Sequence, residues 1–165
     1  MKILFAADEI AARVRALADE IAASGLKPDL AAPILSGAFV FAADLLRALS
    51  EKGLALPMEF LWLRSYGTER SSGEIRVLVG PSDKVRGRTV LLIDGVLDSG
   101  ATLAKAKELL LEEGAGAVLT AVAVDKGIAA VKADYACFSG VTDFIIGYGM
   151  DDGGAHRGLP YIASI

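Results

Sequence analysis

The residues of this chain that are best suited to bind a ligand or transfer a proton lie in the segment 89–103, TVLLIDGVLDSGATL. Its apolar run 90–93 is typical of a buried strand, and two carboxylates, Asp94 and Asp98, follow it. The small-residue turn 99–102 then leads into a helical pattern. A strand, an acidic loop and a helix start place backbone N–H groups and hydroxyls where a phosphate can bind. Because the carboxylates can face sugar hydroxyls, a metal or an acidic proton, the segment predicts a sugar-phosphate site.

Alternating strands and helices are expected to position this segment. Apolar periodicity predicts helices at 8–23, 37–49 and 103–113 and strands at 31–35, 58–63, 75–79, 90–93, 118–124, 135–138 and 144–147. Asp8 is the expected N-cap of the first helix. The polar stretch 64–74 has no apolar periodicity and predicts a long mobile loop. The repeated strand–helix pattern predicts an α/β fold, a mostly parallel central sheet flanked by helices, as a single domain over 1–165.

Four unusual segments follow predicted strands of this sheet. They are residues 35–38, 94–102, 125–127 and 147–157. Ligands of such sheets bind beyond the carboxyl ends of the strands. We therefore expect the four segments to meet at one binding mouth.

Composition excludes several classes of protein. A chain of 165 residues, 53% of them hydrophobic, is long and apolar enough for a real core and argues against disorder. No apolar run approaches the roughly 18–20 residues that span a bilayer, and the acidic residues near the start argue against a secretory signal. The single cysteine, Cys137, cannot form an internal disulfide. With a net charge of −4 and no long basic run, we expect a cytoplasmic protein without nucleic-acid or membrane partners.

The segment 89–103 resembles the phosphoribosyl-pyrophosphate (PRPP) signature of type I phosphoribosyltransferases. Further segments are similar, in order and spacing, to the pyrophosphate loop, the catalytic loop and the purine-binding end of the hypoxanthine-guanine branch: PILSGAFVFAADLLRAL, SYGTERSSGEIRVL, VDKG and DFIIGYGMDDGGAHRGLPYI. The resemblance implies the type I phosphoribosyltransferase fold, with a small purine-side hood and a flexible lid loop. It also implies transfer of the phosphoribosyl group of PRPP to a 6-oxopurine, in purine salvage, with Mg2+ as cofactor and a homodimer or homotetramer as the assembly. Hypoxanthine, guanine and xanthine are the candidate bases.

The resemblance assigns roles around the PRPP signature. Asp98 matches the carboxylate near purine N7 and is the expected general base; the alternative is a helix N-cap. Asp94 matches the first of two acidic residues on the ribose hydroxyls, whereas the second position is Gly95 here. The expected 5′-phosphate loop, which otherwise reads as an ordinary helix start, consists of Ser99, Gly100, Ala101 and Thr102.

The pyrophosphate and lid segments carry further assignments. Ser36 and Gly37 match the loop whose backbone contacts pyrophosphate through an unusual peptide geometry, although the family typically has a lysine where Ser36 stands. Ser65 and Tyr66 match the start of the catalytic lid. A lid that closes over the site would exclude water from a cation-like reaction centre.

The purine-binding end supplies the remaining candidates. Lys126 matches the lysine that recognises the exocyclic oxygen of the purine, and the alternative is a solvated lysine in a turn. Phe144 matches the aromatic residue that stacks on the base but is also compatible with simple core, and Ile145 would offer backbone groups to the base edge. Asp151 matches a magnesium ligand and Arg157 a pyrophosphate-binding arginine; the alternative for both is a surface ion pair.

Two functions of different classes remain open from the sequence. One is an active purine phosphoribosyltransferase, favoured by the chemistry retained at Asp98, Lys126 and Arg157. The other is a weakened or inactive relative that binds PRPP or nucleotide as a sensor or regulatory module, favoured by the departures at Ser36 and Gly95.

Overall fold

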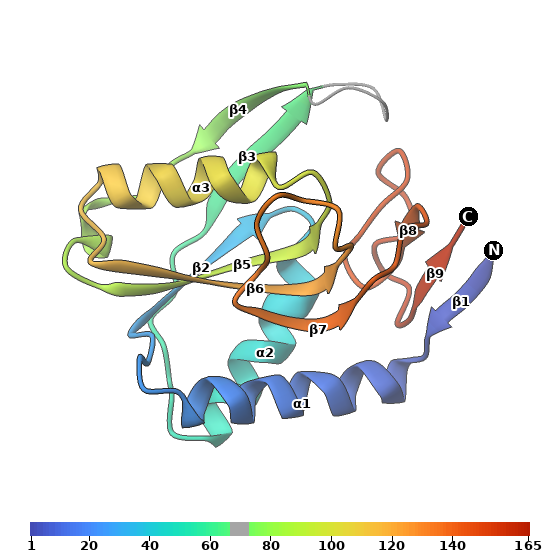
Figure 1. Ribbon diagram of the computed structural model, residues 1–165, viewed down its shortest axis with the longest axis horizontal. Helices are drawn as coiled ribbons and strands as arrows, with labels where there is room; N and C mark the ends of the chain where they lie inside the picture. Colours follow the sequence, from blue (N-terminus) through green and yellow to red (C-terminus); the bar gives the residue numbers. More distant parts are fainter. Residues whose placement is uncertain (67–72) are drawn as a thin grey trace.

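The computed structural model describes residues 1–66 and 73–165 and is built around a six-stranded sheet (Figure 1). Strands β2, β3, β5, β6 and β7 run parallel, and β4 pairs antiparallel with β3. The sheet order is β4-β3-β2-β5-β6-β7, with β2 at Leu30–Leu35, β3 at Leu61–Tyr66, β4 at Glu74–Val79, β5 at Thr89–Leu97, β6 at Ala117–Asp125 and β7 at Tyr135–Ser139. The predicted mostly parallel α/β sheet is confirmed.

Helices cover both faces of this sheet because its central strands are apolar on both sides. Along β5, Leu91 and Ile93 pack toward α1 (Ala7–Ala23) and α2 (Phe39–Glu51). The alternate residues Val90 and Leu92 pack in the second core, with the buried residues of α3 (Ala101–Glu112). Figure 1 shows α1 and α2 on one side of the sheet and α3 on the other. A short 3-10 helix, η1 (Asp83–Val85), precedes β5.

A second, three-stranded antiparallel sheet forms the expected hood. Its order is β1-β9-β8, with β1 at Lys2–Phe5, β9 at Ile162–Ser164 and β8 at Ile145–Ile146. The two ends of the chain therefore pair with each other beside the main sheet (Figure 1). The strand expected at 144–147 is shorter than predicted, and β1 and β9 were not predicted.

Two local predictions were wrong. The stretch 64–74 is not all loop, since β3 continues to Tyr66 and β4 begins at Glu74, with Tyr66 opposite Glu74. Residues 64–66 and 74 are polar and exposed and are held by strand pairing, which apolar periodicity does not reveal. The N-cap of α1 is Ala6, without a side-chain hydrogen bond, and Asp8 lies in the first turn instead. The centre of the predicted lid, 67–72, lies outside the described residues, among which no helix is long and apolar enough to cross a membrane.

Candidate active site

The loops after β2 and β5, the loop after β6 and the hood approach one another at the carboxyl ends of the strands. The backbone N–H of Lys126, after β6, donates to the carbonyl of Leu97 at the end of β5, at 3.0 Å. The carbonyl of Gly37, after β2, lies against both Gly95 of β5 and Gly149 of the hood. Segments that are far apart in sequence thus line one mouth of the sheet, as the strand-end argument predicts.

The turn between β5 and α3 exposes a helix N-terminus. Gly100 is the N-cap of α3 with φ +88°, the left-handed region that favours glycine. The Ala101 N–H donates to Ser99 Oγ at 3.3 Å, and no side chain in this turn is larger than a threonine or aspartate. Because the N-cap is Gly100, the interpretation of Asp98 as a helix cap is wrong. The turn offers N–H groups and hydroxyls to an anion without steric hindrance.

A buried ammonium meets an open carboxylate at the centre of this mouth. Lys126 Nζ lies 3.3 Å from Asp98 Oδ2, with 8% of the lysine side chain exposed against 56% of the aspartate side chain. A buried ammonium is costly without an anionic partner, so the pairing with Asp98 accounts for its position. The interpretation of Lys126 as a solvated turn lysine is therefore wrong.

The loop that presents Lys126 is organised by Asp125, which the sequence analysis did not single out. This buried carboxylate accepts hydrogen bonds from the N–H groups of Gly127, at 2.9 Å, and Ala133, at 3.3 Å. Its own carbonyl accepts from the N–H of Gly140 at 3.0 Å. The signal was present in the sequence, because an aspartate closes an otherwise apolar strand directly before Lys-Gly.

Asp94 is a desolvated carboxyl at the end of the central strand. Burial raises its pKa from 3.8 to about 7, and the hydrogen bond that it accepts from the Gly95 N–H, at 2.7 Å, partly opposes that rise. The group therefore changes protonation near neutral pH. As a carboxylate it is an acceptor-only group that suits two neighbouring sugar hydroxyls.

The hood carries a partly exposed ion pair. Arg157 Nη2 lies 2.9 Å from Asp151 Oδ1, and Arg157 Nη1 donates to the carbonyl of Gly149 at 2.7 Å. The second oxygen of Asp151 accepts from the N–H of Gly154 at 2.7 Å. The ion pair considered from the sequence is present, and both side chains keep about 30% of their surface open to solvent.

Phe144 directly precedes the hood strand β8, and Ile145 is the first residue of that strand. Phe144 keeps 39% of its surface exposed, so it is not a core residue, while Ile145 is buried and pairs with Ser164. An exposed aromatic face can stack on a planar ligand.

The loop after β2 starts with a cis peptide bond between Leu35 and Ser36, an unusual geometry of the kind the resemblance implies. Ser65 and Tyr66, by contrast, lie in the exposed hairpin, where the Arg76 guanidinium stands 4.3 Å above the Tyr66 ring. Their described contacts are with β4, and their assignment to a lid stays a prediction.

No group of three His, Cys, Asp or Glu side chains suited to a metal occurs within residues 1–66 and 73–165. The mouth instead offers single carboxylates, Asp94 and Asp151, among groups that bind anions. Such a donor set fits Mg2+ that arrives bound to a polyphosphate, since this ion usually takes only one or two protein carboxylates and keeps water and phosphate ligands.

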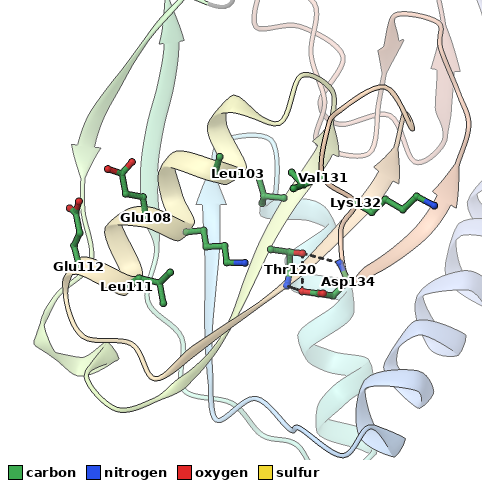
Figure 2. A pocket seen from close by; sticks show the side chains of 10 residues that line it. Leu103, Glu108, Leu111, Glu112, Thr120, Val131, Lys132 and Asp134 are labelled. Atoms are coloured by element: carbon green, nitrogen blue, oxygen red, sulfur yellow. Dashed lines mark hydrogen bonds between the residues drawn. The ribbon is translucent and has the colours of Figure 1, made fainter.

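A separate pocket of about 480 Å³ lies between α3 and residues 131–134 (Figure 2). Thr120 and Asp134 in its wall bond to each other: the Thr120 N–H donates to Asp134 Oδ2 at 2.8 Å, and the Asp134 N–H donates to Thr120 Oγ1 at 2.9 Å. None of the residues assigned to the candidate site lines this pocket.

Comparison with known proteins identifies the family. The model of the phosphoribosyl transferase domain matches residues 1–152. The hypoxanthine-guanine phosphoribosyltransferase of Bacillus subtilis is 34% identical over 98% of this chain and 91% of its own length. The bifunctional protein TilS/HprT of Listeria innocua is 35% identical, and the chain spans 25% of its length. The structure of the hypoxanthine phosphoribosyltransferase of Trypanosoma cruzi with the product IMP superposes with a TM-score of 0.88 at 32% identity, covering 100% of this chain and 94% of that one. The chain belongs to the hypoxanthine-guanine phosphoribosyltransferase family.

Proposed function

We propose that this protein transfers the 5-phosphoribosyl group of PRPP to a 6-oxopurine, with release of pyrophosphate. A bond forms between the purine nitrogen and the anomeric carbon, and the bond from that carbon to the pyrophosphate oxygen breaks. The observation that carries the proposal is the pairing of the buried Lys126 ammonium with the open Asp98 carboxylate, beside an accessible helix N-terminus. This arrangement offers a donor, a proton acceptor and an anion site within one mouth.

The donor and the acceptor suit a purine that carries an oxygen at position 6. An ammonium only donates hydrogen bonds, so Lys126 fits an exocyclic carbonyl and would leave the amino group of adenine without a partner. The Asp98 carboxylate would accept the proton of the purine as the nitrogen attacks. Phe144 would stack on the base, next to the backbone of Ile145.

The remaining groups would hold the phosphoribosyl donor. The turn of Ser99 to Thr102 would bind the 5′-phosphate through N–H groups and hydroxyls, and the Asp94 carboxylate the ribose hydroxyls. Arg157 and the loop of Ser36 and Gly37 would bind pyrophosphate. Asp151 would hold Mg2+, which when bound neutralises part of the pyrophosphate charge.

A turnover assay tests this proposal. The protein is incubated with Mg2+, PRPP and hypoxanthine, guanine, xanthine or adenine in turn, and nucleotide formation is followed by absorbance. We expect product with at least one 6-oxopurine and none with adenine. An Asp98→Asn variant is the control for contaminating activity. PRPP binding without product from any base would refute the proposed enzymatic activity and favour a regulatory module. The presence of a single carboxylate, Asp94, where the family has two acidic residues would agree with that role.

Assembly and location belong to the same proposal. We propose a homodimer or homotetramer in the cytoplasm. Self-association is supported by apolar side chains exposed on and next to the β3–β4 edge: Met58, Phe60, Val77, Leu78 and Val79. Sedimentation equilibrium would test the assembly, and a monomer at micromolar concentration would contradict it. A reducing compartment is compatible with the buried free thiol of Cys137, whose pKa burial raises to about 12.

A further inference from the structure

A buried tyrosine, Tyr148, connects the hood to α2. It is 4% exposed and packs in the core that α1 and α2 share with the sheet, where its ring centroid lies 6.4 Å from that of Phe41. Its hydroxyl donates to Asp44 Oδ2 at 2.6 Å, and the other oxygen of Asp44 pairs with Arg47. Burial, together with the Asp44 carboxylate, raises the pKa of the hydroxyl, so it remains a hydrogen-bond donor near neutral pH.

The backbone at Tyr148 has a conformation that a tyrosine rarely adopts. Its φ is +51°, in the left-handed region, and its neighbours Gly147 and Gly149 also have positive φ. A residue with a side chain is strained in this region and persists there only where its surroundings fix it. The contacts of the tyrosine side chain with Phe41 and Asp44 therefore offset this strain and hold the turn in place.

The turn that Tyr148 anchors holds Arg157. The next residue, Gly149, donates its N–H to the Arg157 carbonyl at 2.9 Å and accepts from Arg157 Nη1 through its own carbonyl at 2.7 Å. Farther along the turn, Asp151 Oδ1 lies 2.9 Å from Arg157 Nη2. The N–H of Tyr148 itself donates to the carbonyl of Leu159 at 2.9 Å. Both Nη atoms of the guanidinium are thus oriented by residues that closely follow Tyr148.

On its other side, Tyr148 contacts the helix that follows the proposed pyrophosphate loop. Phe41 and Asp44 lie in the first half of α2, which begins at Phe39, shortly after Gly37. A movement of Tyr148 relative to α2 would therefore displace Arg157 relative to that loop.

The Tyr148 hydroxyl is not available to a ligand of the site, because it is buried and already donates to Asp44. Asp44 lines a pocket of about 210 Å³ between α1 and α2, and no residue assigned to the candidate site lines that pocket. An effect of this hydrogen bond on a bound anion has to pass through the backbone of the turn and the arginine that the turn holds.

We propose that Tyr148 is a positioning residue for the transfer reaction: its buried side chain and its hydrogen bond to Asp44 hold the turn that orients the Arg157 guanidinium for pyrophosphate. The inference rests on the proposed function, because that function assigns Arg157 to pyrophosphate. A guanidinium binds an anion as a planar fork, so its strength depends on its orientation. A small displacement of the fork misaligns its hydrogen bonds and lowers the affinity.

The test measures binding of inorganic pyrophosphate with Mg2+ by isothermal titration calorimetry. Tyr148→Phe keeps the ring and removes the hydroxyl, and we expect the dissociation constant to rise about fivefold or more. Asp44→Leu should produce the same rise from outside the site, whereas Asp44→Asn keeps an acceptor for the hydroxyl and should stay within about twofold of the unmodified protein. The matched control is Tyr135→Phe, at a partly buried tyrosine of β7, which should leave the affinity unchanged. An unchanged affinity in either Tyr148→Phe or Asp44→Leu would overturn the inference.

A double-mutant cycle separates positioning of Arg157 from direct contact with the ligand. Arg157→Lys keeps the positive charge, so that binding stays measurable, but it lacks the fork that contacts Gly149 and Asp151. If the tyrosine acts through the arginine, adding Tyr148→Phe to Arg157→Lys should weaken binding by less than about twofold more. Additive losses would show that Tyr148 acts independently of Arg157 and would overturn the inference.

Inosine monophosphate, which carries no pyrophosphate, distinguishes the inference from general destabilisation. In Tyr148→Phe its dissociation constant should change less than about twofold, while the KM for PRPP rises in parallel with the dissociation constant of pyrophosphate. An equal loss of affinity for both ligands would overturn the inference. Failure of the proposed function has a different signature, because the unmodified protein would then bind neither pyrophosphate nor inosine monophosphate.

Discussion

Substitution of Asp94 by asparagine isolates the effect of one buried carboxyl on stability and binding. Burial raises the pKa of this group from 3.8 to about 7. Asn has nearly the same shape and still accepts the hydrogen bond from the Gly95 N–H through its side-chain oxygen. It does not titrate, so Asp94→Asn removes the pH dependence and leaves most of the packing.

The sign of the effect follows from the protons bound in each state. Between pH 3.8 and about 7 the folded protein holds the Asp94 proton and the unfolded chain has lost it, so the free energy of unfolding falls as pH rises through this window. At about 1.36 kcal/mol for each pKa unit, the full difference corresponds to about 4 kcal/mol. From pH 5 to pH 8 we expect the free energy of unfolding to fall by about 2 kcal/mol more in the unmodified protein than in Asp94→Asn. This fall is smaller than the full difference because Asp94 keeps some exposure to solvent.

Urea denaturation of both proteins at four pH values from 5 to 8 measures this difference. The unmodified protein should lose stability relative to Asp94→Asn as pH rises, and the difference should level off above pH 7. PRPP binding gives an independent readout, because the ionised carboxyl is the better acceptor. The affinity of the unmodified protein for PRPP should rise about tenfold from pH 6 to pH 8, after subtraction of any change in the variant. The variant serves as the control because protonation of PRPP itself affects both proteins equally. A stability difference that is flat across this range would refute the assignment of a raised pKa to Asp94.

Three further changes test the site and its support. Asp98→Asn should lower kcat about 100-fold or more by removing the proton acceptor, with a change in PRPP affinity of less than about threefold by calorimetry; equal losses would contradict the role as base. Lys126→Gln should raise the KM for hypoxanthine about tenfold or more, because it removes the ammonium donor, and an unchanged KM would exclude the lysine from base recognition. Tyr148→Phe should lower the free energy of unfolding by about 1–2 kcal/mol, because the Tyr148 hydroxyl donates a hydrogen bond to Asp44 Oδ2 at 2.6 Å and so connects the hood to α2. Urea denaturation measures the free energy of unfolding, and a more stable variant would contradict the prediction.

The sequence predicted the central sheet because its strands are apolar on both faces. Residues 90–93 and 118–124 lie in β5 and β6, whose inward-facing side chains fill the two cores on opposite sides of the sheet. Two strands of the hood, β1 and β9, escaped prediction because they are short and pair across the whole length of the chain. The strands predicted at 58–63 and 75–79 correspond to β3 and β4, but the extension of β3 to Tyr66 and of β4 to Glu74 escaped prediction, since these strand ends are exposed and show no alternation with a buried face.

Site residues could be predicted from the sequence where the residue type alone indicates a chemical role. Aspartates after a strand and a lysine before a glycine indicated Asp98 and Lys126, yet their pairing at 3.3 Å depends on the approach of β5 to β6. The exposure of Phe144 and the burial of Lys126 also depend on tertiary packing, and residue type alone left both undecided.

The two departures from the family pattern, Ser36 and Gly95, belong to one structural arrangement. Gly95 appears in the sequence as a lost carboxylate beside Asp94. In the structure its missing side chain is replaced by the carbonyl of Gly37, the neighbour of Ser36. A side chain at position 95 would require that carbonyl to move, so the two departures are adjacent in space and are not independent of each other.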